Sequence, residues 1–391
     1  MKPSRWILVV ALACGGFGIG VSEFLIMGLL PQIATDLLPD LMDRQRDVAL
    51  AATGSLASAY ALGVVVGIFT TPLLVRRLSE RHALLVCAGS MLLWTLLTAL
   101  APTLAIAIVL RFLSALTHAS FIGVGAMAVA HLMGSNSYGR GSAIVHGGLA
   151  LANLVGVPTL TALGEVLDWR IILGACALFF AAPFAALLAI NVPDHGHAVA
   201  AVSTVRVRPR SLLLVLVGAV VSAAGGFTIV TYVAPLTLWA RGGDAWLSAA
   251  IAMLAFGIGM NIGNFVAGLM SDRAPGLAFG GAITAGAAGA ALLMVPGIGG
   301  VGAGLGVLLV GVLLGGQGPA GQVLYLRELS RFPRLASSLP SGTGNMGSFV
   351  GALVGAGLLA GFGPAVIPIG AIALLGAGLL IFVIYSRVAR P

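Results

Sequence analysis

Two formally charged side chains interrupt long apolar stretches of this sequence. Glu23 lies within the run from Gly15 to Leu37, and Arg111 lies within the run from Leu104 to Leu132. A charge at the centre of a membrane-spanning helix costs roughly 2.5–3.5 kcal/mol, so such residues usually act on a proton, an ion or a polar substrate. Because desolvation disfavours a charged carboxyl, Glu23 is suited to taking up a proton on one side of a membrane and releasing it on the other.

Two interpretations of this pair stay open. In the first, Glu23 carries protons and Arg111 tunes it or orients a substrate. In the second, Glu23 is locked to Arg111 for stability, or Arg111 packs against carbonyls and helix ends. Every acid and base after Ser211 lies in a loop or at the edge of an apolar run. This asymmetry predicts that ionic coupling takes place in the first half of the chain.

Histidines and neutral polar groups are candidates for supporting roles. His118 follows Arg111 by seven residues, so a continuous helix would carry both on one face. Histidine titrates near neutrality, so His118 or His146 is either a proton relay or a hydrogen-bonded packing residue. The second half offers amides inside its apolar runs, namely Asn261, Asn264, Gln317, Gln322 and Asn345.

The sequence holds no pattern typical of an enzyme or a metal site. It has no Gly-x-Ser-x-Gly, no Walker loop and no Cys-x-x-Cys. Its three cysteines lie in apolar runs, and no His, Cys and carboxylate cluster has the spacing of metal ligands. We therefore expect no enzymatic activity, no metal and no cofactor.

The composition is that of a membrane protein. The 391 residues are 59% hydrophobic and 8% charged, whereas a soluble domain carries about 25% charged residues. Twelve apolar segments, the first read as a retained span, can be counted between Trp6 and Tyr385. Runs longer than about 18 residues predict helical spans, so we expect an all-α integral membrane protein.

The distribution of basic residues predicts the orientation. Of the 20 Lys and Arg residues, fifteen fall on the side that holds both termini and four on the other. By the positive-inside rule, both termini lie in the cytoplasm. The same rule accounts for the net charge of +8, so we expect no nucleic-acid partner.

Two repeated halves are predicted. The longest hydrophilic break divides the spans six and six, giving an N-terminal six-helix bundle (1–191), a cytoplasmic linker (192–211) and a C-terminal bundle (212–391). Gly63-Val-Val-Val-Gly67 recurs 196 residues later as Gly259-Met-Asn-Ile-Gly263. Two pseudo-symmetric bundles around a midplane site are a transporter plan.

Several motifs resemble those of the major facilitator superfamily, specifically its twelve-span drug:proton antiporters. The loop from Pro72 to Arg81 is similar to the motif between spans 2 and 3, but Arg76 stands where an aspartate is usual. The corresponding loop of the second half keeps the motif better. Other matching elements are Arg77, Asp272 and Arg273 in these loops, Arg111-Phe-Leu-Ser-Ala in span 4, and Gly148 through Gly156-Val157-Pro158 to Gly164 in span 5.

The first span resembles that of actinobacterial chloramphenicol efflux proteins. It holds Ser22-Glu23-Phe24, followed by Met27-Gly-Leu-Leu-Pro-Gln-Ile-Ala-Thr-Asp-Leu37. The resemblance implies a proton-coupled exporter of small amphipathic drugs, with chloramphenicol-type antibiotics as the first candidate, working by alternating access. The residues we expect to serve are Glu23, Arg111 and His118 for proton coupling, Glu23, Met27, Tyr60, Asn261 and Asn345 for substrate binding, and Arg77, Gly156, Pro158, Asp272 and Arg273 for structure.

Two other functions are weighed against this one. Exporters of sugars, nucleosides or other metabolites share the first-span pattern, so one of these is the alternative. A membrane sensor or scaffold would need a signalling domain, and the sequence shows none outside the apolar segments. The resemblance further implies a monomer in the bacterial inner membrane, with a drug, protons and the lipid bilayer as its partners.

Overall fold

The computed structural model describes residues 3–75, 77–133, 138–190, 209–295, 297–329 and 333–388. Within these ranges the chain is helical and has no strand, as predicted. Arg76 and residues 192–208 of the predicted linker lie outside the described residues. The elements are α1 (Pro3–Gly28), α2 (Leu30–Leu37), α3 (Pro39–Arg44), α4 (Arg46–Thr53), α5 (Ser55–Val75), α6 (Glu80–Ala99), α7 (Leu104–Ala115), α8 (His118–Met133), α9 (Tyr138–Leu151), the π-helix η1 (Ala152–Gly156), α10 (Val157–Leu163), α11 (Trp169–Ala189), α12 (Pro209–Val230), α13 (Val233–Ala240), α14 (Ala249–Ser271), α15 (Pro275–Leu293), α16 (Gly299–Glu328), α17 (Pro333–Phe362), the 3-10 helix η2 (Pro364–Val366) and α18 (Ile367–Val388).

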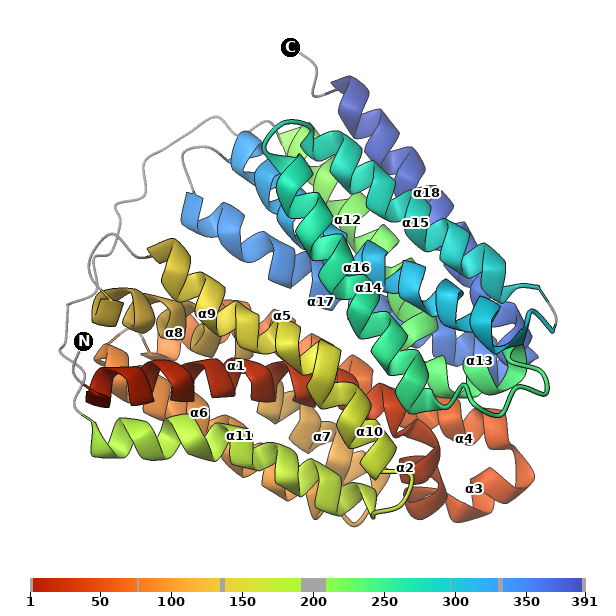
Figure 1. Ribbon diagram of the computed structural model, residues 1–391, viewed down its shortest axis with the longest axis horizontal. Helices are drawn as coiled ribbons and strands as arrows, with labels where there is room; N and C mark the ends of the chain where they lie inside the picture. The colour runs from red at the N-terminus through yellow and green to blue at the C-terminus, as the bar shows by residue number, and fades with distance from the viewer. Residues whose placement is uncertain are drawn as a thin grey trace. The chain divides into compact units, whose positions relative to one another are not determined.

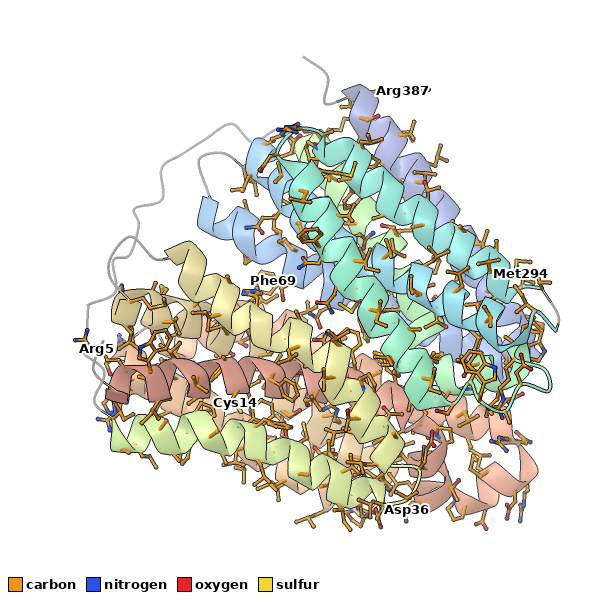
Figure 2. All side chains as sticks on the ribbon, in the orientation of Figure 1. Arg5, Cys14, Asp36, Phe69, Met294 and Arg387 are labelled. Atoms are coloured by element: carbon orange, nitrogen blue, oxygen red, sulfur yellow. The ribbon has the colours of Figure 1, made fainter. Side chains whose placement is uncertain are left out.

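Twelve stretches of the described chain are long and apolar enough to cross a membrane. Their outward faces carry large apolar side chains, among them Phe69 on α5 and Met294 at the end of α15, both labelled in Figure 2. Phe69 is 70% exposed. Such a surface suits lipid, and helices satisfy their backbone polar groups without water. The described part of the chain is therefore a multi-pass membrane protein.

Contacts divide the chain into two compact units. The first comprises Met1–Ile26 and Ala59–Val202, and the second comprises Met27–Ser58 and Ser203–Pro391. The last two residues of α1, all of α2, α3 and α4, and the start of α5 thus group with the second unit.

Small residues let the helices of the first unit approach closely. Helix α1 lies alongside α9 and α11 (Figure 1), and its Gly16 meets Val145 of α9 while its Gly18 meets Phe179 and Phe180 of α11. A Cβ on Gly20 would lie 2.7 Å from the Cβ of Ala152. Small residues at such crossings are a recurring device of membrane helix packing.

The predicted repeat is visible in backbone contacts. In the first unit, Gly63 and Gly67 of α5 pack against the carbonyl oxygens of Phe112 and Leu116 in span 4. In the second unit, the glycines of α14 pack in the same way on α16, where Gly259 meets the carbonyl of Leu308 and Gly263 meets that of Val312. The glycines and the carbonyls are each 196 residues apart. The two halves therefore share a contact pattern as well as a sequence pattern.

Several of the described spans are interrupted, and three of these breaks lie close to the site described below. Span 1 breaks between α1 and α2 at Leu29, just before Pro31. Span 4 breaks at Leu116 and Thr117, where the Leu116 carbonyl accepts a hydrogen bond from the Thr71 hydroxyl at 2.6 Å. Span 5 contains the π-helical turn η1, with Pro158 at the second position of the helix that follows. Irregular backbone at membrane depth needs such internal partners, because lipid supplies none.

Candidate functional site

Arg111 is the centre of a buried polar group in the first unit. Its side chain is fully buried. Nη1 donates to Ser22 Oγ at 2.9 Å, and Nη2 donates to the Ser22 carbonyl oxygen at 2.8 Å. The guanidinium carbon also lies 4.3 Å from the centroid of the Tyr60 ring. Desolvated cation–π contacts contribute about 2 kcal/mol, so these three contacts together compensate a charge placed inside the protein.

Tyr60 joins Arg111 to His118. The Tyr60 hydroxyl lies 3.2 Å from His118 Nδ1, and both side chains are buried. Ser22, Arg111, Tyr60 and His118 thus form a continuous set of contacts, which we call the polar chain. Histidine can hold a proton at either ring nitrogen, so the polar chain places one titratable side chain within hydrogen-bonding distance of the Tyr60 hydroxyl.

His118 reaches this position by a different route from the one predicted. A continuous helix was expected to place Arg111 and His118 on one face. Span 4 is instead interrupted at Leu116 and Thr117, and His118 is the first residue of α8. Both residues still contact one aromatic side chain, Tyr60. The break in span 4 is thus part of the local structure that holds the polar chain.

Glu23 stands next to the polar chain without being paired to it. It follows Ser22 directly in α1 and is half-buried. Within the described residues, its side chain forms neither an ion pair nor a hydrogen bond, and the Arg111 hydrogen bonds go to Ser22. The charge of Arg111 still acts on the carboxyl through space. The carboxyl therefore has its two oxygens available while a fixed positive charge lies nearby.

Two buried polar atoms near α1 lack a hydrogen-bond partner among the described residues. One is Arg111 Nε, a donor, and the other is Asn153 Oδ1, an acceptor. Each such atom costs about 1–3 kcal/mol relative to a satisfied one. Asn153 lies within the span 5 motif from Gly148 to Gly164 but is not one of the motif residues named from the sequence. The side chain is 1% exposed and lies on the π-helical turn η1, a feature often found at functional sites.

The predicted substrate contacts divide between the two units. Glu23 and Tyr60 belong to the first unit, and Met27, Asn261 and Asn345 belong to the second. Met27 is buried. Asn261 Nδ2 donates to the Gly257 carbonyl at 2.9 Å. Asn345 Nδ2 donates to the Ser341 carbonyl at 3.0 Å, and its buried Oδ1 has no hydrogen-bond partner among the residues that the structure describes.

The predicted structural residues lie at helix ends and in span 5. Gly156 and Pro158 are buried, and a Cβ on Gly156 would lie 2.5 Å from the Phe17 ring. Arg77 is exposed after α5, as are Asp272 and Arg273 after α14.

Residues beside the degenerate loop motif tie helix ends together. Arg81 donates from Nε to the Leu187 carbonyl at 2.8 Å and from Nη2 to the Leu188 carbonyl at 3.0 Å. Glu80 forms an ion pair with His131, whose Nδ1 lies 3.0 Å from Oε1. This pair joins the start of α6 to the last turn of α8. His131 therefore has a structural contact of its own, away from the polar chain.

Comparison with known proteins identifies the family to which the chain belongs. The family model described as Major Facilitator Superfamily matches residues 12–334. The chain belongs to the Major Facilitator Superfamily. Members of this superfamily are transporters with twelve helices in two six-helix halves, which agrees with the twelve spans and the repeated glycine contacts. The resemblance seen in the sequence is thereby confirmed, as is the fold class.

Two relatives match most of this facilitator. The inner membrane transport protein YdhP of Escherichia coli K12 is 31% identical over 97% of this chain and 96% of its own. A chloramphenicol resistance protein of Streptomyces lividans is 34% identical over 70% of this chain and 68% of its own.

A solved structure shares the fold across the whole facilitator. A bacterial homologue of the human lysosomal transporter Spinster, in its inward-facing and occupied conformation, matches with a TM-score of 0.72. The match covers 99% of this chain and 98% of that one at 16% identity. The solved structure thus shares the fold, and membership of the superfamily makes the chain a multi-pass membrane transporter of small molecules.

Proposed function

We propose that this facilitator exports small amphipathic drugs in exchange for protons, with chloramphenicol-type antibiotics as the first candidates. The observation that carries the proposal is the unpaired carboxyl of Glu23 beside the buried guanidinium of Arg111. A carboxyl locked in an ion pair would exchange its proton only after the pair had broken. Glu23 has no such partner among the described residues, so it is free to bind a proton or a drug in turn.

Each residue of the polar chain has a role in this proposal. Arg111 supplies a fixed positive charge that favours release of the Glu23 proton. Tyr60 holds Arg111 in place and connects it to His118. His118 exchanges protons with the cytoplasmic side, and Met27, Asn261 and Asn345 remain proposed substrate contacts from the second unit. We further propose that the protein functions as a monomer in the bacterial inner membrane, with both termini in the cytoplasm.

The energetics are sufficient for drug resistance. One proton moving inward gains about 2.3 kcal/mol per 100 mV of membrane potential. Since each 1.4 kcal/mol is a factor of about ten in an equilibrium, one proton per drug sustains a gradient of roughly tens-fold. The drug class itself is supported by the resistance protein of Streptomyces lividans, which covers most of this chain.

The decisive variant is Glu23→Gln, which removes the titratable group and keeps the size of the side chain. In proteoliposomes with an imposed proton gradient, wild-type protein is expected to release protons when chloramphenicol is added. Glu23→Gln should abolish this release, because the amide cannot carry a proton. Glu165→Gln is the matched control, since Glu165 is exposed in the loop before α11 and its loss should leave proton release unchanged.

Two results would count against the proposal. Proton release that is intact in Glu23→Gln would exclude Glu23 as the carrier. Transport of a sugar or nucleoside by the wild-type protein, without any response to the drug, would show that the substrate is a metabolite and not a drug.

A further inference from the structure

We propose that Asn153 is a specificity-determining contact whose Oδ1 accepts a hydrogen bond from the primary hydroxyl group of a chloramphenicol-type drug. The inference rests on the proposed function and adds the chemical group that a substrate must present. It starts from an atom that the drug-export mechanism leaves unused. Asn153 Oδ1 is buried and has no hydrogen-bond partner in the part of the chain that the structure describes.

The orientation of the amide identifies the free atom. Nδ2 donates to the Leu149 carbonyl at 3.3 Å. Only the NH2 end of the side chain can meet a carbonyl oxygen favourably, so the oxygen end is the one that remains without a partner. The site thus offers an acceptor, and a ligand that uses it must bring a donor.

The packing of span 5 on α1 places this acceptor near Glu23. A Cβ on Gly20 would lie 2.7 Å from the Ala152 Cβ, and a Cβ on Gly156 would lie 2.7 Å from Val21. Asn153 lies between these two contacts along the chain. Since an α-helix rises about 1.5 Å per residue, the level of Gly20 and Val21 is within one turn of Glu23. Asn153 is therefore level with the proton-binding group in the first unit.

The π-helical turn explains why an amide is presented here. In η1 the Val157 N–H donates to the Ala152 carbonyl, five residues earlier, which inserts an extra residue into the turn. Pro158 has no N–H to give to the preceding turn. Together these features keep span 5 irregular where it faces α1 and hold Asn153 in a position that a regular helix would not provide.

Complementary groups define the class of substrate. Among the described residues, Asn153 Oδ1 is a buried acceptor without a hydrogen-bond partner. A neutral molecule that carries a hydroxyl group among apolar ones can supply the missing donor. Chloramphenicol-type antibiotics have this chemistry.

A matched pair of drugs tests the contact. Thiamphenicol and florfenicol differ at one carbon, which bears a hydroxyl in the first and a fluorine in the second. Transport of both is measured in proteoliposomes for the wild type, Asn153→Ala and Asn153→Asp. We expect Asn153→Ala to raise the KM for thiamphenicol about three- to tenfold, as for one lost hydrogen bond, and to leave the KM for florfenicol unchanged. Asn153→Asp retains an acceptor and should keep the preference for thiamphenicol.

The control is Thr161→Val, which removes from the same span a buried hydroxyl that has no hydrogen-bond partner among the described residues and should change neither KM. If both drugs lose affinity equally in Asn153→Ala, or neither does, the contact is wrong and the proposed function stands. If the wild-type protein moves neither drug, the proposed function fails and the contact fails with it. Should Asn153→Ala not fold, a florfenicol-to-thiamphenicol KM ratio near one in the wild type would also overturn the contact.

Discussion

At the scale of single residues, the main finding is that, in the part of the chain that the structure describes, the buried Arg111 side chain is held without a carboxylate partner. Arg111 is bound by a hydroxyl, a carbonyl and an aromatic face, all in the first unit. Removing one partner of a buried ion pair typically costs 3–5 kcal/mol, and a pair between Arg111 and Glu23 would make the carboxyl a structural group. Within the described residues, these neutral partners leave the Glu23 carboxyl without an ion pair, as the proposed proton exchange requires.

The hydroxyl of Tyr60 should matter for coupling more than for folding. Tyr60→Phe keeps the ring against Arg111 but removes the contact with His118, so we expect a stability loss of about 1 kcal/mol and drug-driven proton release that is several-fold slower. Tyr325→Phe is the control, because it removes a buried hydroxyl that contacts Thr343 at 3.1 Å in the second unit. It should cost similar stability and leave proton release unchanged, and equal slowing in both variants would refute a relay through Tyr60.

The charged residues of the site could be predicted from the sequence, but the residues that contact them could not. Glu23 and Arg111 stand out because charges are rare in apolar runs. Ser22 and Asn153 do not stand out, because a serine or an asparagine is common in any membrane helix and its importance depends on what lies opposite. The positions of their partners depend on how α1, span 4 and span 5 cross, and one sequence contains no distances.

At the scale of helices, close backbone approaches determine where the polar side chains lie. Gly67 of α5 packs against the carbonyl of Leu116, the residue at which span 4 breaks. The same carbonyl accepts the Thr71 hydroxyl. Two residues of α5 thus hold the break that separates Arg111 from His118. The glycine pattern was predictable from sequence, whereas the break was not, because it contains no proline or glycine.

Gly67→Ala should therefore destabilise the protein. The new Cβ would overlap the Leu116 carbonyl, and overpacking of this kind costs about 1–3 kcal/mol. A lower unfolding temperature in detergent, together with reduced transport, is the expected result. Gly147→Ala in α9 is the control, because a Cβ there meets nothing within 4 Å. Equal unfolding temperatures for the two variants would show that Gly67 packs less tightly against the Leu116 carbonyl than described.

At the scale of the whole molecule, the sequence predicted twelve spans, and the described chain contains twelve. Composition suffices for this number because lipid imposes length and polarity on every span alike. The division of the chain into two units by contacts is less predictable from the sequence. Residues 27–58 group with the second unit by contacts, although they precede the predicted linker by more than a hundred residues.

Thiol labelling checks the orientation derived from the basic residues. A cysteine at Asp40 in α3 should react with a membrane-impermeant maleimide in intact cells, whereas a cysteine at Arg387 should react only after the membrane is opened. Both positions are exposed. The wild-type protein supplies the background, since Cys87 and Cys176 are buried and Cys14 is half-buried. The opposite labelling pattern would place the termini outside.

The repeat allows the two halves of this transporter to be compared position by position. At the offset of 196 residues that relates the glycine contacts, Tyr60 corresponds to Phe256 and Arg111 to Val307, both fully buried. The halves thus share their backbone contacts but differ in chemistry at these two positions. The second half can therefore serve as an internal control, because it keeps the same helix packing without the tyrosine and the arginine.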